Sequence, residues 1–102
     1  MIVNLTPHVV NEINTKMAFV PSGKVARVAT VTIETGEKCE GVTLYSTTYG
    51  AIEGLPAPED GVTYLVSGMV LSATDRKDVV APGELVRDSS GKPVGCKGFK
   101  SN

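Results

Sequence analysis

The residue types that carry out catalysis are few in this chain, and they are not spaced as a catalytic set. His8 is the only histidine, so a hydrolytic triad or a histidine-bound metal has a single candidate base or ligand. It follows Pro7 near the chain start, a position that favours a structural role. Cys39 and Cys96 form no CxxC or zinc-like pattern. We therefore expect free thiols, no metal, no cofactor and no enzymatic activity.

The acidic residues give no better catalytic pair. Glu59 and Asp60 are adjacent in a turn rich in proline and glycine, where neighbouring side chains diverge. Asp75 and Asp78 flank two basic residues, which is typical of a solvated loop that neutralises its own charge. No GxGxxG or Walker-type loop is present, and no helix follows Gly91 and Lys92 to make a phosphate site.

A second group of residues suits ligand binding. Residues 47–56 join two strand-like runs and exceed the about two to five residues of a hairpin turn. Arg27 lies within a predicted strand, where its charge projects to solvent, pairs with a carboxylate or reaches a ligand. Arginines, hydroxyls and an aromatic ring together fit a small polar anion or a nucleotide. Ordinary strand composition and surface arginines remain the alternative explanation. The candidate ligand contacts are Arg27, Thr47, Thr48, Tyr49, Arg76 and Arg87.

Length and composition predict the kind of fold that positions these residues. The chain has 102 residues, of which 41% are hydrophobic and 21% are charged, so we expect one globular domain over residues 1–102. It has no Trp, and branched apolar residues dominate, which favours strands. A chain of this size buries only about two-thirds of its unfolded surface. Association with copies of itself is therefore a further source of stability, and we expect a homo-oligomer.

The order of apolar runs and turns predicts a fold class. Residues 2–13 form one strand or two around a bend at Pro7, residues 24–34 are the clearest strand, and residues 62–66 are a central one. Ser67 resembles the N-cap of one or two helical turns, and residues 85–96 form a terminal hairpin. The prediction is a mainly β fold: a compact antiparallel barrel or sandwich of about six or seven short strands with at most one short helix.

Charge and hydropathy limit the kinds of binding partner that we expect for this chain. The net charge is −1, whereas proteins that coat DNA or RNA carry a basic excess, so no extended nucleic acid is expected. The longest apolar run, residues 64–73, falls short of the about 20 residues that span a bilayer. No leader-like segment opens the chain. We expect no membrane partner and a reducing cytoplasm as the setting.

Several blocks in one order resemble a family of small bacteriophage and prophage proteins. They include Asn4–His8, Pro21–Val28, Thr47–Gly50 with Gly54–Pro56, and Asp78–Gly83 followed by Val86–Cys96. The resemblance covers nearly the whole chain, and it implies the cytoplasm of an infected bacterium as the setting. Small phage proteins without catalytic residues often act by binding. One such class sequesters nucleotide-derived immune signals, of the cyclic oligonucleotide or cyclic ADP-ribose type, between subunits.

Two functions follow as expectations. The first is a non-enzymatic phage protein that sequesters a nucleotide-type immune signal and so antagonises bacterial defence. The alternative is a structural or interaction protein, either a minor virion component or an adaptor that blocks a host protein, and it predicts an exposed apolar patch. An enzyme that uses Tyr49 or His8 as acid or base is the least favoured.

Overall fold

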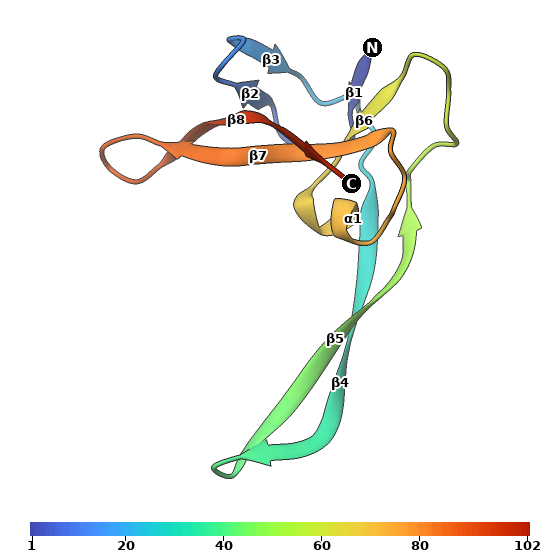
Figure 1. Cartoon of the computed structure of the whole chain (residues 1–102), viewed down its shortest axis with the longest axis vertical. Coiled ribbons are helices and arrows are strands. Elements are labelled where there is room, and N and C mark those ends of the chain that lie inside the picture. The colour runs from blue at the N-terminus through green and yellow to red at the C-terminus, as the bar shows by residue number, and fades with distance from the viewer.

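The computed structural model describes residues 1–102, and strands make up most of it (Figure 1). In chain order the elements are β1 (Ile2–Asn4), β2 (Val10–Glu12), β3 (Met17–Phe19), β4 (Arg27–Cys39), β5 (Val42–Glu53), β6 (Thr63–Leu65), α1 (Gly68–Ser72), β7 (Val79–Arg87) and β8 (Pro93–Ser101). The predicted mainly β fold with one short helix is confirmed. The strands number eight instead of six or seven, because residues 10–19 form two short strands of their own.

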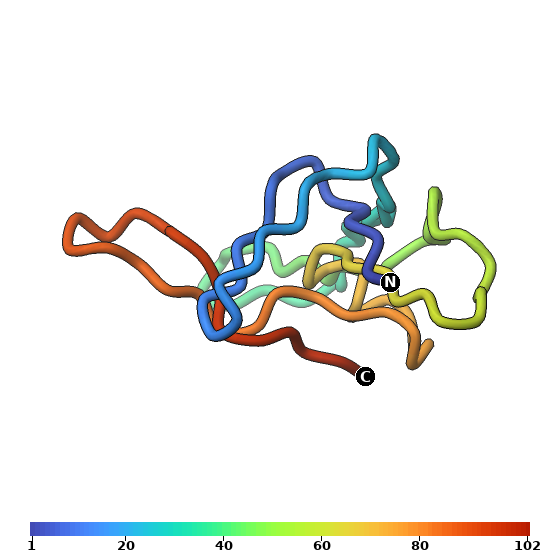
Figure 2. The backbone as a smooth tube through the Cα atoms, turned by 90° about the horizontal axis from the view of Figure 1, so that it is seen from above, coloured from blue at the N-terminus to red at the C-terminus, as the bar shows by residue number.

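Six strands form one sheet in the order β1-β6-β7-β8-β2-β3, and this sheet curls until its two edges meet. Asn4 at the end of β1 forms a parallel bridge with Pro21, just after β3. The side-chain Nδ2 of Asn4 donates to the Phe19 carbonyl at 2.8 Å, and the backbone amide of Ser22 donates to the Asn4 carbonyl at 3.0 Å. The result is a nearly closed, barrel-like sheet, which Figure 2 shows from above.

The strand directions are mixed. The longest ladders, β4 with β5 and β7 with β8, are antiparallel as predicted. Three short pairs are parallel, namely β1 with β6, β6 with β7, and β2 with β8. Parallel neighbours need a connection of about a dozen residues or more. Residues 66–78, which include α1, supply one between β6 and β7, and sequence analysis had not recognised this segment as a crossover.

The core lies between the sheet and α1. Leu5, Val66, Val70 and Val79 are almost completely buried there, together with Tyr64, Ala26, Leu71 and Ala81. Ser67 precedes α1 with extended backbone, and its hydroxyl accepts a hydrogen bond from the Val70 amide at 3.3 Å. The predicted N-cap is therefore confirmed. The cap directs the helix so that Val70 and Leu71 face the sheet.

Strands β4 and β5 pair only with each other and project away from the sheet (Figure 1). We call Arg27–Glu53 the arm and the rest of the chain the body. The arm ends in a two-residue turn, Glu40 and Gly41, both with positive φ, because Cys39 and Val42 are cross-strand partners. Two expectations are corrected here. Residues 35–38, where a glycine among polar residues predicts a turn, are an irregularity in the ladder, and residues 47–53 are strand instead of loop.

The arm makes the molecule longer than a globular chain of its size. Its radius of gyration is 16.5 Å, and its extents are 49 × 40 × 23 Å. A compact domain of about 100 residues has a radius of about 13 Å. The predicted compact shape therefore does not extend to residues 27–53. No helix has the length and apolar character needed to cross a bilayer.

Candidate functional site

The arm has one apolar face and one hydroxyl-rich face. Successive residues of a strand point to opposite sides, and cross-strand partners share a side. Val31 lies opposite Thr48, and Ile33 lies opposite Ser46. Leu44 is on the same side, two residues before Ser46 along β5. We call Val31, Ile33, Leu44, Ser46 and Thr48 the apolar face. Val31 is 51% exposed and Ile33 is 50% exposed, so no part of the body covers this face.

The opposite side of the arm carries hydroxyl groups and two aromatic rings. Thr30 lies opposite Tyr49, Thr32 lies opposite Thr47, and Glu34 lies opposite Tyr45. We call these six residues the hydroxyl face. It too is exposed along its length. Such a surface can donate and accept hydrogen bonds and can stack on a planar ligand.

The pleat separates the three candidate contacts that are adjacent in the sequence. Thr47 and Tyr49 lie on the hydroxyl face, whereas Thr48 lies on the apolar face. The Thr48 hydroxyl donates to the Val31 carbonyl across the ladder at 3.4 Å. The prediction that the three side chains share one ligand loop is wrong, because these residues continue a strand. A ligand on one face of the arm can touch Thr47 and Tyr49 together, but not Thr48.

Arg27 lies at the root of the arm, as the first residue of β4 instead of in a strand interior. Its strand partner is Glu53, but its guanidinium forms no ion pair: the single salt bridge of the chain joins Arg76 and Asp78. Arg27 lines a groove of about 300 Å³ between residues 25–28 and α1, which we call the root groove. The other lining residues are Leu5, Thr6, Pro7, Val25, Ala26, Val28, Ser67, Met69 and Val70.

Arg76 is occupied by the fold. Its Nε and Nη2 donate to the two carboxylate oxygens of Asp78 at 2.9 and 2.6 Å, and its Nη1 donates to the Pro56 carbonyl at 2.9 Å. The guanidinium also lies over the Tyr64 ring, 5.9 Å from its centre. The hydrogen bonds from Arg76 lower the pKa of Asp78, and the same bonds raise the pKa of Arg76. The Arg76 guanidinium thus links Pro56 to Asp78 and has few donors left for a phosphate.

Arg87 lies at the far end of β7, where the terminal hairpin leaves the body (Figure 1). Its Nη1 donates to the Gly91 carbonyl at 2.9 Å, so it braces the hairpin turn. Within one chain, the structure thus groups Thr47 with Tyr49 on the hydroxyl face and places Arg27 at the root of the same arm. It brings neither Arg76 nor Arg87 to them.

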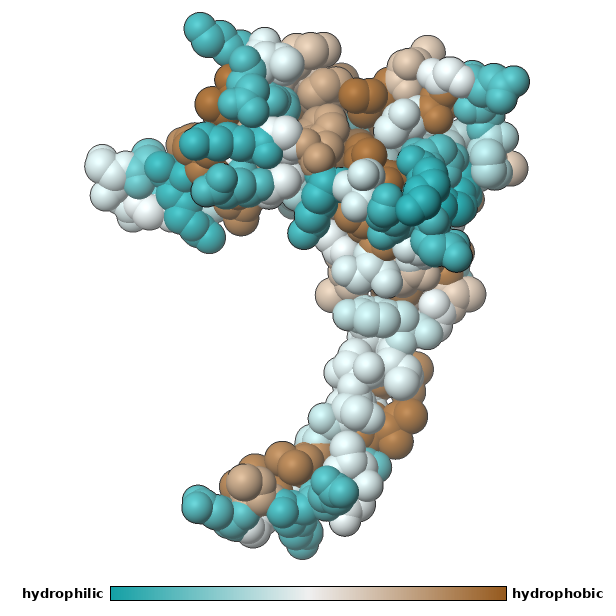
Figure 3. Space-filling model, in the orientation of Figure 1, coloured by the Kyte–Doolittle hydropathy of each residue, from teal (hydrophilic) through white to brown (hydrophobic).

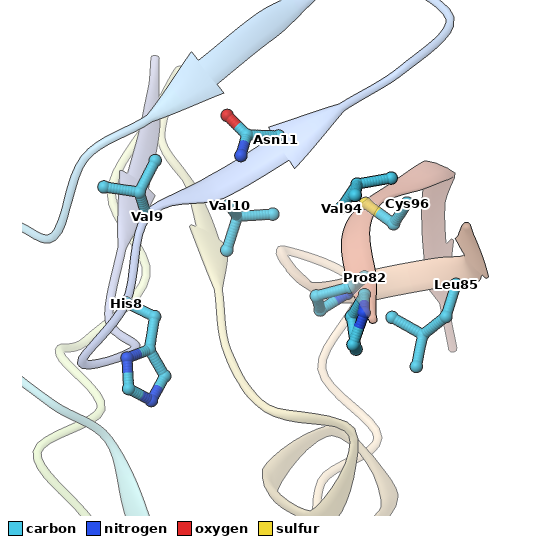
Figure 4. A pocket seen from close by; sticks show the side chains of 10 residues that line it. His8, Val9, Val10, Asn11, Pro82, Leu85, Val94 and Cys96 are labelled. Carbon is cyan, nitrogen blue, oxygen red and sulfur yellow. The ribbon is translucent and has the colours of Figure 1, made fainter. Parts of the chain in front are cut away.

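A second groove lies on the body, between residues 8–11 and the β7–β8 hairpin (Figure 4). We call it the body groove. Its volume is about 330 Å³, and its lining residues are His8, Val9, Val10, Asn11, Pro82, Leu85, Pro93, Val94, Gly95 and Cys96. Most of these are apolar, and Val9, Leu85 and Val94 are exposed. This surface cannot be recognised from the sequence, because its two walls come from opposite ends of the chain.

His8 and Cys96 line the same groove but do not fit a nucleophile–base pair. Cys96 is only 1% exposed, and burial raises its pKa, whereas a nucleophilic cysteine needs a stabilised thiolate. Figure 4 shows the His8 ring and the Cys96 thiol on opposite walls. The hydrogen bonds at His8 are accepted by its carbonyl, from Asn4 and Thr6. The hydrogen bonds at this position therefore involve the His8 backbone and not its ring.

Two buried polar residues that sequence analysis passed over have structural roles. Asn4 donates to two carbonyls and accepts from the amide and hydroxyl of Thr6. Glu12 accepts from the amides of Thr15 and Gly98. For Asn4, the sequence signal of a structural role is a polar side chain within the apolar run of residues 2–5. All their buried polar atoms have partners, so neither is left free for a ligand.

Comparison with protein-family models, with curated proteins and with solved structures gave no match to this chain. The chain also gathers no group of three histidine, cysteine or acidic side chains that could hold a metal ion. The candidate sites are therefore defined by geometry alone: the two faces of the arm, the root groove and the body groove.

Proposed function

We propose that this chain is a non-enzymatic binding protein that sequesters a small nucleotide-type ligand and works as a homo-oligomer. The ligand would lie at the root of the arm, at an interface between subunits. Its anionic part would meet Arg27, and its planar part would stack on Tyr49. The resemblance to phage proteins supports a nucleotide-derived immune signal, of the cyclic oligonucleotide or cyclic ADP-ribose type, and the cytoplasm of an infected bacterium.

The observation that carries this proposal is that Arg27 lines the root groove and forms no salt bridge. An arginine without a carboxylate partner has its full set of donors for a phosphate, in the forked geometry that phosphate oxygens match. Thr6, Ser67 and Met69 line the same groove. Its volume, about 300 Å³, lies at the lower end of the range for small-molecule sites.

Arg27 also connects the groove to the arm. It begins the strand whose residues Thr30 and Thr32 share the hydroxyl face with Tyr49. A ligand larger than the groove would extend along this face and place its bases near the Tyr49 ring. Base–aromatic stacking contributes about 1–3 kcal/mol per base. In an oligomer, a neighbouring chain could bring Arg87 to the ligand, although in one chain that residue lies elsewhere.

The first test is the absorbance of the protein purified from bacteria. The chain has no Trp and three Tyr, so its own absorbance near 280 nm is weak. A co-purified nucleotide would then appear as an excess near 260 nm, and chromatography with mass spectrometry of the heat-released material would identify it. In parallel, calorimetry with cyclic di-AMP and with cyclic ADP-ribose measures binding directly. No excess absorbance and no heat with either compound would overturn the proposal.

A pair of variants that each remove one positive charge makes the test specific. Arg27→Ala removes charge-assisted hydrogen bonds, each contributing about 1.5–3 kcal/mol, so we expect affinity to fall about 10- to 100-fold. Lys16→Ala removes a positive charge from an exposed turn outside all the candidate sites, and it serves as the control. Equal losses in the two variants would show non-specific attraction instead of a site at the arm root.

A second function is favoured by a different observation. The apolar face of the arm is exposed, which is what a structural or interaction protein requires. In this alternative the arm binds a virion protein or a host protein. Detection of the chain in purified virions by mass spectrometry would support the virion version, and its absence there would exclude that version.

A further inference from the structure

The chain exposes more surface than a folded monomer of its mass. Its solvent-accessible surface is 6,892 Å², whereas a monomer of 10.7 kDa is expected to expose about 5,500 Å². The excess is therefore about 1,400 Å² per chain. Two chains that covered it on each other would bury about 2,800 Å², which is within the range of obligate homodimers.

The excess lies mainly in the arm. Nearly every residue of β4 and β5 beyond the root is exposed, and an isolated two-stranded hairpin is at best marginally stable in water. Val28 and Ile52 anchor the root against the core. Beyond them only the ladder itself holds the strands together. The space-filling view shows apolar residues along the arm, well away from the body (Figure 3).

A second exposed apolar surface lies on the body, where the arm of the same chain does not reach. Val9, Leu85 and Val94 rim the body groove and are 49%, 55% and 44% exposed. The arm leaves the body on the side of α1, whereas this groove lies between residues 8–11 and the β7–β8 hairpin (Figure 1, Figure 4). The chain thus carries a projecting apolar face and an open apolar groove at two separate places.

The two segments that carry these surfaces have opposite net charges. The arm has two basic and four acidic residues, which are Arg27, Lys38, Glu34, Glu37, Glu40 and Glu53. Residues 79–101, which form one wall of the groove, have four basic and two acidic residues, which are Arg87, Lys92, Lys97, Lys100, Glu84 and Asp88. The net charges are therefore −2 and +2. Packing one arm on another arm would bring like charges together and leave the groove uncovered.

We propose that the apolar face of the arm of one copy seats in the body groove of a second copy. Reciprocal exchange of arms would close a two-fold dimer, in which each chain contributes one arm and one groove. Val31, Ile33 and Leu44 would contact Val9, Leu85 and Val94. The inference rests on the homo-oligomer of the proposed function and identifies the surfaces that form it. This contact would not use the hydroxyl face or the root groove, so both would remain available for the ligand beside the interface.

Sedimentation velocity of three variants tests the proposal. Val31→Thr with Ile33→Thr removes the apolar face while keeping branched side chains that suit a strand. Leu85→Thr with Val94→Thr removes the rim of the groove. Each double variant should weaken self-association at least about tenfold, as substitutions at the centre of an interface do. Val20→Thr changes an exposed apolar residue outside both surfaces, and it should leave association unchanged.

Mixing the two double variants separates this arrangement from others. The arm variant keeps an intact groove, and the groove variant keeps an intact arm, so a mixture should regain association through one arm in one groove. If arms pack on arms, the groove variant alone would associate normally, which would overturn the proposal. A monomeric wild-type chain would overturn it as well. Far-UV circular dichroism confirms that each variant is folded before it is scored.

Photocrosslinking from the tip of the arm provides an independent measurement. Cys39 is exposed at the tip, so it can be labelled with a maleimide–benzophenone reagent. In a mixture of ¹⁴N and ¹⁵N chains, adducts between copies should map to residues 8–11 or 79–101. Adducts confined to residues 27–53 of the other copy would contradict the proposal. Both experiments run without nucleotide, so they can fail while ligand binding by calorimetry succeeds, and the reverse also holds.

Discussion

Strands β7 of the body and β4 of the arm are both rich in branched apolar residues, but their surroundings differ. Val79 in β7 is completely buried against α1 and β6, whereas Val31 in β4 is 51% exposed. The two strands have a similar pattern of apolar residues because each has one apolar side that must be shielded from water. At Val79 and Ala81 the body covers that side with its own chain. The arm presents it to solvent, and in our proposal a second copy covers it.

Polar groups differ between the two regions in the same way. In the body, Asn4 is buried and makes four hydrogen bonds that link β1, the bend after it and the end of β3. In the arm, side-chain hydrogen bonds are few and exposed, such as that from the Thr35 hydroxyl to the Leu44 carbonyl. The body therefore holds its shape through many interlocked contacts, whereas the arm depends on its ladder. Substitutions that compare the two regions test this difference.

The largest expected difference is in the reactivity of the two thiols. Cys39 is exposed at the arm tip, and Cys96 is buried in β8. In the dilute, unassociated chain we expect Cys39 to react with a thiol reagent on the order of a thousandfold faster, because Cys96 reacts only when the body opens. Burial also raises the pKa of Cys96, which lowers its thiolate fraction further. Peptide mass spectrometry of time points measures both rates, and similar rates would mean that the body is as open as the arm.

The same substitution in the two regions should have unequal effects on stability. Leu5 is 1% exposed in the core, and Leu44 is 38% exposed on the arm. Leu5→Ala should lower the free energy of unfolding by about 3–4 kcal/mol, because it removes buried methyl groups and leaves a cavity. Leu44→Ala should lower it by less than about 1 kcal/mol in the dilute chain. Urea unfolding followed by circular dichroism measures both, and equal losses would place the arm within the cooperative core.

The body was the more predictable part of the fold. The broken strand at residues 2–13, the central strand at 62–66 and the Ser67 cap depend on local signals, namely a proline, an apolar run and a hydroxyl before a helix. The parallel pairs were not predictable in this way, because they join segments far apart in the chain. Pairing of this kind depends on which surfaces remain uncovered, and no single segment carries that information.

The arm was misjudged for a physical reason. Glycine usually marks a break in a strand. The segment with Gly36 and Lys38 is therefore predicted to be a turn, and the segment with Gly50 and Gly54 is predicted to be a loop. In the structure, Gly36 adopts a φ of +82° within an irregular ladder, and Gly50 lies close to Ala29, where a larger side chain would crowd the facing strand. The candidate contacts at 47–49 lie on an exposed segment, but the alternation of a strand divides them between its two faces.

Two glycines with positive φ sharpen the comparison. Gly54 has a φ of +81°, and a Cβ there would lie 2.5 Å from the Val25 carbonyl oxygen at the arm root. Gly36 has a φ of +82°, and a Cβ there would meet nothing within 4 Å. Gly54→Ala adds a backbone clash to the conformational strain and should cost about 2–3 kcal/mol. Gly36→Ala adds the strain alone, about 1 kcal/mol. Thermal unfolding compares them, and a larger loss at Gly36 would contradict this packing.

The smallest expected effect depends on pH. Hydrogen bonds from Arg76 lower the pKa of Asp78, so the folded state binds this proton less readily than the unfolded state does. The pair therefore stabilises the fold above the ordinary pKa of an aspartate, and this contribution is lost as the pH falls through the lowered value. Asp78→Asn should cost about 1–2 kcal/mol at neutral pH and little in acid.

The arm supplies the control for this acid dependence. Glu37 lies in β4 near the tip, is exposed, and forms no salt bridge. Glu37→Gln should therefore leave the free energy of unfolding and its pH dependence unchanged in the dilute chain. Urea titrations between neutral and acid pH measure both variants. If Glu37→Gln flattened the acid dependence while Asp78→Asn did not, the charge that holds the chain together would lie in the arm, and the division into a self-sufficient body and a dependent arm would be wrong.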